Sequence, residues 1–206
     1  MRAKALMFLL PGVLLLMLAP LAGCIFSPDP DPDPVKPPPP PAYVFPDTPD
    51  KVIDNLQEAY EKMDIDGYRN VLHMNYIFKF QQYDIDNLNL PSDHLTREED
   101  LESSTNLFSG NAVNGVPGVS QITWPSNEKE GTWETSYNPE FPNSQRCLYN
   151  FEMNITRPGA TTIIVKGKQE FYVAERDSMV DGSPRQYWEL LGQVDLSDIE
   201  TKGEAL

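Results

Sequence analysis

Histidine, cysteine and basic residues are scarce in this chain of 206 residues. It has two histidines, two cysteines and 16 lysines and arginines, against 31 aspartates and glutamates. The net charge of −15 argues against nucleic acid as a partner, because phosphate binding requires a basic face. The same charge argues against electrostatic adhesion to anionic lipid headgroups. We expect the acidic surface to serve mainly solubility.

The motifs of several enzyme classes are also missing. The sequence has no Walker loop, no GxSxG elbow and no HExxH zinc motif. His73 and His94 share no ligand spacing, so we expect no zinc site. The acidic segment 84–93 lacks the matching glycine and terminal glutamate of an EF-hand loop, which favours a solvated loop over a Ca²⁺ site. The sequence therefore predicts neither a metal nor another cofactor.

A basic start followed by an apolar run over residues 5–22 is typical of an export signal. The run ends in Leu21-Ala22-Gly23-Cys24. This ending resembles the lipobox of bacterial lipoproteins, which implies cleavage before Cys24 and lipid attached to its thiol. An uncleaved transmembrane anchor is the alternative, since the run is about as long as a minimal span. Pro11 and Pro20 favour cleavage.

The resemblance implies a location in the bacterial cell envelope, anchored to a membrane through Cys24. Ile25 follows the cysteine where an aspartate would retain the protein at the inner membrane, so the outer membrane is expected. Cys147 then has no partner within the chain, and an unpaired thiol in an oxidising compartment should be buried.

Proline dominates residues 28–47, with five in succession at 37–41. Proline fixes φ and has no N–H, so we expect polyproline II, reaching roughly 60 Å at about 3.1 Å per residue. Such a tether would hold a domain clear of the membrane. The predicted organisation is a signal peptide over 1–23, a lipidated cysteine and tether over 24–47, and one α+β domain over 48–206.

Helix signals come first in this domain. Thr48-Pro49-Asp50 is a helix start, followed by apolar residues at spacings of three and four up to Met63. Asp64-Ile65-Asp66-Gly67 ends that helix and begins a short second one, with His73 expected at its end. A third helix is predicted from Thr96, with Glu99 completing a capping box, to about Gly110.

Alternation with a period of two marks the strands. Tyr76, Phe78 and Phe80 alternate with polar or less buried neighbours, and three long strands joined by turns follow from Cys147 onward. We expect Gly167 to mark a bulge or bend. Residues 111–145 are harder to read, with short strands expected over 119–124 and 132–137.

Helices first and a curved antiparallel sheet afterwards, with the helix-to-helix joint Asp64-Ile65-Asp66-Gly67, resemble the NTF2-like superfamily, also called SnoaL-like or ketosteroid-isomerase-like. The resemblance implies a cone in which the N-terminal helices pack on a curved antiparallel sheet around a pocket. Aligning this joint with that of the steroid isomerases puts Leu56 and Phe80 at the two catalytic positions. Neither can transfer a proton, so we predict no catalytic residue, and a one-turn shift would leave Tyr60 as the nearby acid.

Aromatic side chains at inward positions are the expected lining of such a pocket. They are Tyr60, Tyr76, Phe80, Tyr149, Phe151, Phe171 and Trp188. The simplest interpretation is that these side chains form the core. The alternative is that they line a pocket for an apolar small molecule. Three functions remain open: a non-catalytic lipoprotein that binds an apolar ligand or an envelope protein, an isomerase, dehydratase or hydrolase of the same fold, and an assembly protein that forms a homodimer through its sheet.

Overall fold

The computed structural model describes residues 43–197 apart from residues 89, 160–161 and 181. The predicted signal peptide, Cys24 and the proline run lie outside the described residues. Within the described part of the chain, no helix is both long and apolar enough to cross a membrane.

Helices and strands follow one another in an α+β order along the described chain. They are α1 (Pro49–Lys62), α2 (Ile65–Val71), β1 (Leu72–Lys79), α3 (Gln82–Leu88), β2 (His94–Thr96), α4 (Arg97–Phe108), β3 (Gln121–Thr135), β4 (Ser144–Thr156), β5 (Ile163–Val180) and β6 (Ser183–Asp195).

The helix ends follow the predicted signals. Asp64 is the N-cap of α2, and its carboxylate accepts hydrogen bonds from the backbone N–H groups of Asp66 and Gly67. Thr96 and Glu99 form the predicted capping box of α4. Thr48 is the N-cap of α1, but its side chain makes no capping hydrogen bond. Helix α1 is held instead by the apolar stripe that it buries.

One six-stranded sheet has the order β2-β1-β6-β5-β4-β3. Neighbouring strands are antiparallel except β1 and β6, which are parallel. The sheet is therefore mixed, and the prediction of an antiparallel sheet was wrong at this pair. Because most of the domain separates β1 from β6 in sequence, no tight turn requires them to run in opposite directions.

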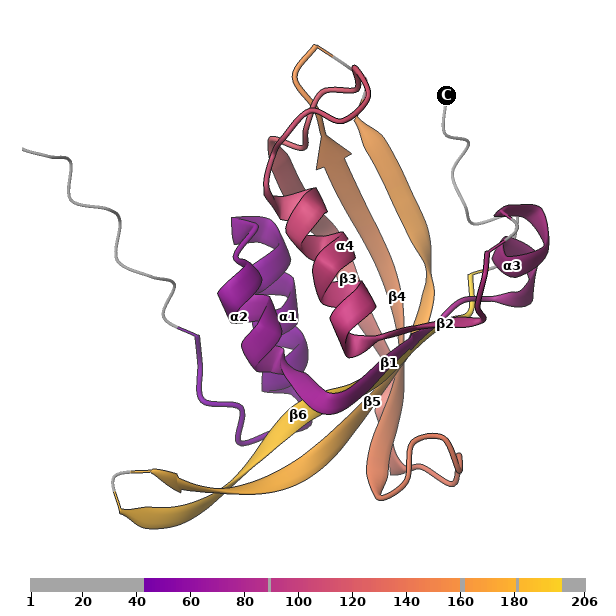
Figure 1. Ribbon diagram of the computed structural model, residues 1–206. Helices are drawn as coiled ribbons and strands as arrows, with labels where there is room; N and C mark the ends of the chain where they lie inside the picture. Colours follow the sequence, from indigo (N-terminus) through magenta and orange to yellow (C-terminus); the bar gives the residue numbers. More distant parts are fainter. Residues whose placement is uncertain (1–42, 89, 160–161, 181, 198–206) are drawn as a thin grey trace, which may run out of the picture. The chain divides into compact units, whose positions relative to one another are not determined.

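Helices α1, α2 and α4 lie on one side of the curved sheet (Figure 1). The main core lies between these helices and the sheet. It includes the fully buried side chains of Leu56, Tyr76, Phe171 and Leu190. The long β5–β6 hairpin extends past the helices. Strand curvature thus leaves one side of the sheet for the helices and for a cavity beside them.

Several elements differ from the predictions. Residues 121–135 form one long strand in place of two short ones, with register shifts near residues 123–126 and 130–134. Half of the predicted acidic loop is helix α3, and His73 lies in β1 rather than at the end of a helix. Gly167 pairs regularly with Phe151. A Cβ at residue 167 would lie 1.7 Å from Ser197 Oγ, so close approach, not a bulge, requires this glycine.

Residues 43–47, predicted as the end of the tether, contact the domain. Tyr43 Oη donates a hydrogen bond to Asp64 at 2.8 Å, and the carbonyl of Pro46 accepts from the backbone N–H of Trp188 at 2.8 Å. Asn55 holds the backbone of Val44 through both its N–H and its C=O. The segment that contacts the domain thus extends back to Tyr43, before the predicted domain start at residue 48.

Candidate functional site

A cavity of about 530 Å³ lies between the helices and the sheet. Its lining is mostly apolar, with a few polar groups: Leu56, Tyr60, Phe78, Leu95, Asp100, Ser103, Ser104, Leu107, Trp124, Phe151, Met153, residues 163–166, Gln169, Gln193, Asp195 and Ser197. Few but well-placed polar groups in an apolar cavity are typical of a small-molecule site.

Asp100, on the first turn of α4, is the buried carboxylate of this cavity. Only 7% of the residue is exposed, and its Oδ2 accepts a hydrogen bond from Tyr68 Oη at 2.5 Å. Burial raises the pKa of Asp100 to about 6, although the bond from Tyr68 acts in the opposite direction. Asp100 therefore changes charge at mildly acidic to neutral pH.

Tyr60, on α1, is another ionisable group at the cavity wall. Its ring contacts those of Tyr68, Phe108 and Trp124 edge-on, with centroids 5.1–5.9 Å apart. Burial, and then the nearby charge of Asp100, raise its pKa well above the ordinary tyrosine value. The hydroxyl of Tyr60 is consequently a hydrogen-bonding group and not an anion at neutral pH.

A second buried tyrosine, Tyr76, hydrogen-bonds to polar side chains of the sheet. Tyr76 Oη, on β1, donates a hydrogen bond to the side-chain oxygen of Gln193 on β6. Gln193 Nε2 in turn donates to Gln169 Oε1 on β5 at 3.3 Å. Both glutamines line the cavity. The cavity thus has a carboxylate on α4 and amide groups on the sheet.

The structure separates the seven aromatic residues predicted to line a pocket. Tyr60 and Phe151 line the cavity. Tyr76, Tyr149 and Phe171 are buried in the main core. Phe80 follows β1 and packs on Phe78 at 5.2 Å between ring centroids. Trp188 lines a smaller cavity of about 310 Å³ beside the segment 43–46.

Sequence reasoning missed Asp100, because an acid in the first turn of a helix is usually explained by the helix dipole. Helical spacing held a signal that could have found it. Asp100, Ser104 and Leu107 recur at spacings of four and three, which puts them on one face of α4. Leu107 is the apolar member of that set, so the face is turned to the interior.

The remaining candidates are Cys147 and the acidic segment 84–93. Cys147 is buried and free, as predicted, and burial raises the pKa of its thiol. Among the described residues, no group of three or more histidine, cysteine or acidic side chains could hold a metal ion. The acidic residues near 84–93 are divided between α3 and the turn before β2.

Helices packed against a curved mixed sheet around a cavity define the NTF2-like cone fold, as the sequence predicted. No protein-family model and no curated protein sequence matches the chain. A conserved protein from Planctomyces limnophilus is similar in structure, with a TM-score of 0.50 and 13% identity over 72% of this chain and 94% of that one. At this identity the likeness concerns the fold alone.

Two further solved structures are similar over comparable lengths. A ketosteroid isomerase-like protein from Erwinia carotovora atroseptica has a TM-score of 0.44 and 10% identity, covering 72% of this chain and 94% of that one. An NTF2-like protein of unknown function from Cytophaga hutchinsonii has a TM-score of 0.36 and 10% identity, covering 73% and 90%.

Proposed function

We propose that this protein is a lipid-anchored protein of the bacterial cell envelope whose NTF2-like domain binds an apolar small molecule. The observation that carries the binding function is the 530 Å³ cavity with its mainly apolar wall. Pockets of roughly 300–1,000 Å³ enclose most of a small organic molecule, so the volume suits such a ligand.

The polar groups of the cavity constrain the ligand. When ionised, the carboxylate of Asp100 only accepts hydrogen bonds, and it already accepts one from Tyr68. Ligand atoms near it would therefore be donors, such as a hydroxyl or an amine. Leu56, Phe151 and Leu107 offer apolar contacts to the rest of the molecule. The expected ligand is an apolar body with a hydrogen-bond donor.

Filling the mouth of the cavity tests this function. Ser103 is exposed and lines the cavity, so tryptophan there should narrow the opening at little cost in stability. With Nile red as an apolar probe, we expect the wild-type protein to bind and Ser103→Trp to lose most of the binding. Glu102→Trp, exposed on the same helix and outside the cavity lining, is the matched control. Equal binding by all three proteins would place the probe elsewhere and defeat the proposal.

The lipid anchor rests on the sequence around Cys24 and needs its own test. Intact-mass analysis of the membrane fraction should give a chain that begins at Cys24 and carries added lipid mass. Cys24→Ser should abolish that lipid mass, because serine has no thiol to carry the lipid. Membrane retention without lipid mass in the wild type would contradict the anchor.

An enzyme is the second candidate, favoured by one observation. A buried carboxylate with a pKa of about 6 lies close to Tyr60 at a cavity wall, and acid–base catalysis works best with a pKa near the working pH. Such a carboxylate could accept a proton from a bound molecule. Substitution of Asp100 by asparagine separates the candidates, because an enzyme would lose turnover whereas a binding protein would change only in its affinity for the ligand.

A further inference from the structure

The side of the sheet away from the helices has an apolar cluster of its own. Tyr172 and Ala174 on β5 and Leu191 on β6 are buried there together with Phe141. Phe141 belongs to the β3–β4 loop, residues 136–143. We call the opposite side of the sheet, where these strand residues lie, the outer face. This apolar cluster on the outer face is thus covered by the chain's own loop.

Phe141 is the centre of this cover. Its side chain is fully buried, and its ring stacks on that of Tyr172 with centroids 4.0 Å apart and planes inclined by 24°. The ring occupies the space above Gly192, where a Cβ would lie 2.1 Å from Phe141 Cε1. A glycine near the end of β6 therefore makes room for the loop.

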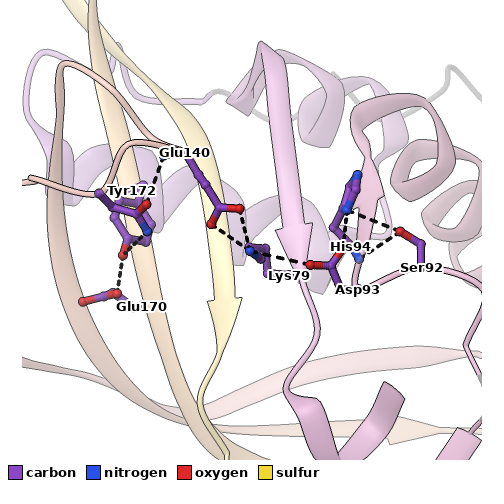
Figure 2. A network of polar contacts seen from close by, with 8 residues as sticks. Lys79, Ser92, Asp93, His94, Glu140, Glu170 and Tyr172 are labelled. Carbon is purple, nitrogen blue, oxygen red and sulfur yellow. Dashed lines mark hydrogen bonds and ion pairs between the residues drawn. The ribbon is translucent and has the colours of Figure 1, made fainter. Parts of the chain in front are cut away.

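Polar contacts fix the loop at its edges (Figure 2). Glu140 forms an ion pair with Lys79 of β1 at 2.7 Å, and Lys79 also faces Asp93, 3.8 Å away. At the other side, Asn138 Nδ2 donates to Tyr172 Oη at 3.4 Å. The loop is therefore attached to β1 as well as to β5.

Charged pairs lie on the outer face beyond the loop. Arg146 on β4 pairs with Glu170 on β5 at 2.6 Å. Lys168 pairs with Glu130 at 3.2 Å, and Lys166 with Glu152 at 2.8 Å. These pairs join neighbouring strands on a face that is otherwise open. Burying them against a flat partner would remove their hydration, which costs more than such pairs return.

We propose that the β3–β4 loop covers the surface of the outer face to which a second copy of this chain would otherwise bind. The protein then does not associate through its sheet, contrary to the homodimer that the sequence left open. The apolar patch under the loop promotes self-association only when the Phe141 side chain no longer covers it, because uncovered apolar patches on sheets promote association.

Light scattering of the full chain in detergent, with the detergent contribution subtracted, tests this. We expect the mass of one chain for the wild type and a shift to two or more chains for Phe141→Ala. Phe141→Leu, which keeps an apolar cover, is the matched control and should stay at one chain. Tyr172→Lys, added to Phe141→Ala, should restore one chain because it charges the uncovered patch. Circular dichroism verifies that each variant is folded.

Gly192→Ala serves as a second variant if Phe141→Ala is unfolded. Its Cβ displaces the Phe141 ring without deleting it, so the same shift to a larger mass is expected. A folded Phe141→Ala variant that remains a single chain would overturn the proposal. So would a wild-type dimer that is broken by Leu148→Arg, which adds a charge on the outer face.

Discussion

Asp100→Asn should raise the free energy of unfolding by about 2–3 kcal/mol at pH 7. Burial lifts the pKa of this carboxyl from 3.8 to about 6, and each pKa unit corresponds to about 1.36 kcal/mol. At neutral pH the folded wild type must hold a buried negative charge that the unfolded chain holds in water. Asparagine keeps an oxygen for the Tyr68 hydroxyl and carries no charge.

The direction of the pH dependence follows from the same pKa. Between about pH 4 and pH 6 the folded protein keeps the Asp100 proton while the unfolded chain has lost it, so the folded state binds more protons. Stability from this group is therefore complete below pH 4 and falls as the pH rises towards 6. Above pH 6 the loss is complete. Asp100→Asn should remove this fall.

Urea unfolding curves at pH 4, 5, 6 and 7 would measure the effect. Glu98→Gln is the matched control, because Glu98 is an exposed acid in the same turn of α4. Its curve should stay parallel to that of the wild type. A variant Asp100→Asn that loses stability at pH 7, or that keeps the wild-type pH dependence, would show that Asp100 is not destabilised by burial.

A stabilising substitution at a cavity wall also bears on function. Residues that cost stability are commonly those that a binding or catalytic site requires. If Asp100→Asn is more stable but binds Nile red or the natural ligand differently, the carboxylate acts on the ligand. An unchanged affinity with lost turnover would favour the enzyme over the binding protein.

Sequence signals within a single segment correctly predicted several helix starts and strands. The capping box at Thr96 and Glu99 and the N-cap at Asp64 gave the helix starts, and alternation gave β4, β5 and β6. The long strand β3 was missed because polar residues such as Asn127-Glu128-Lys129-Glu130 show no alternation. Its pairing with β4 fixes it, and pairing between distant segments cannot be read from one segment.

The site was harder to predict for a similar reason. Leu56, placed by resemblance at a catalytic position, does line the cavity, whereas Phe80, placed at the other, does not. The cavity's ionisable groups with raised pKa values are Asp100 and Tyr60, which are 40 positions apart in the sequence. Their proximity depends on how α4 packs beside α1, and that packing arises only in the folded chain.

The burial of the β3–β4 loop on the outer face could not be predicted from the local sequence either. Phe141 lies between Glu140 and Pro142 in a segment without periodicity, so nothing local marks it as buried. Tyr172 and Leu191 read as outward residues of amphipathic strands. Only the position of the loop over Gly192 joins these residues into a second apolar cluster.

Phe171→Ala is expected to have the largest effect on stability, a loss of about 3–5 kcal/mol. Phe171 is fully buried at the centre of β5, with its ring edge-on to Tyr149 at 5.2 Å. Strands on both sides and helices above prevent collapse around the lost ring, so a cavity remains. Since folded proteins are stable by about 5–15 kcal/mol, this variant should be near the limit of folding.

Phe141→Ala provides the comparison that isolates the cause. Both phenylalanines are fully buried, and both substitutions remove the same atoms. The cover of Phe141 is a loop, however, and a loop can lift from the sheet instead of leaving an enclosed cavity, so its loss should be clearly smaller. Thermal unfolding of the two variants side by side measures the difference. Equal losses would show that the loop is as rigid as the main core, and that it does not lift from the outer face when Phe141 is shortened.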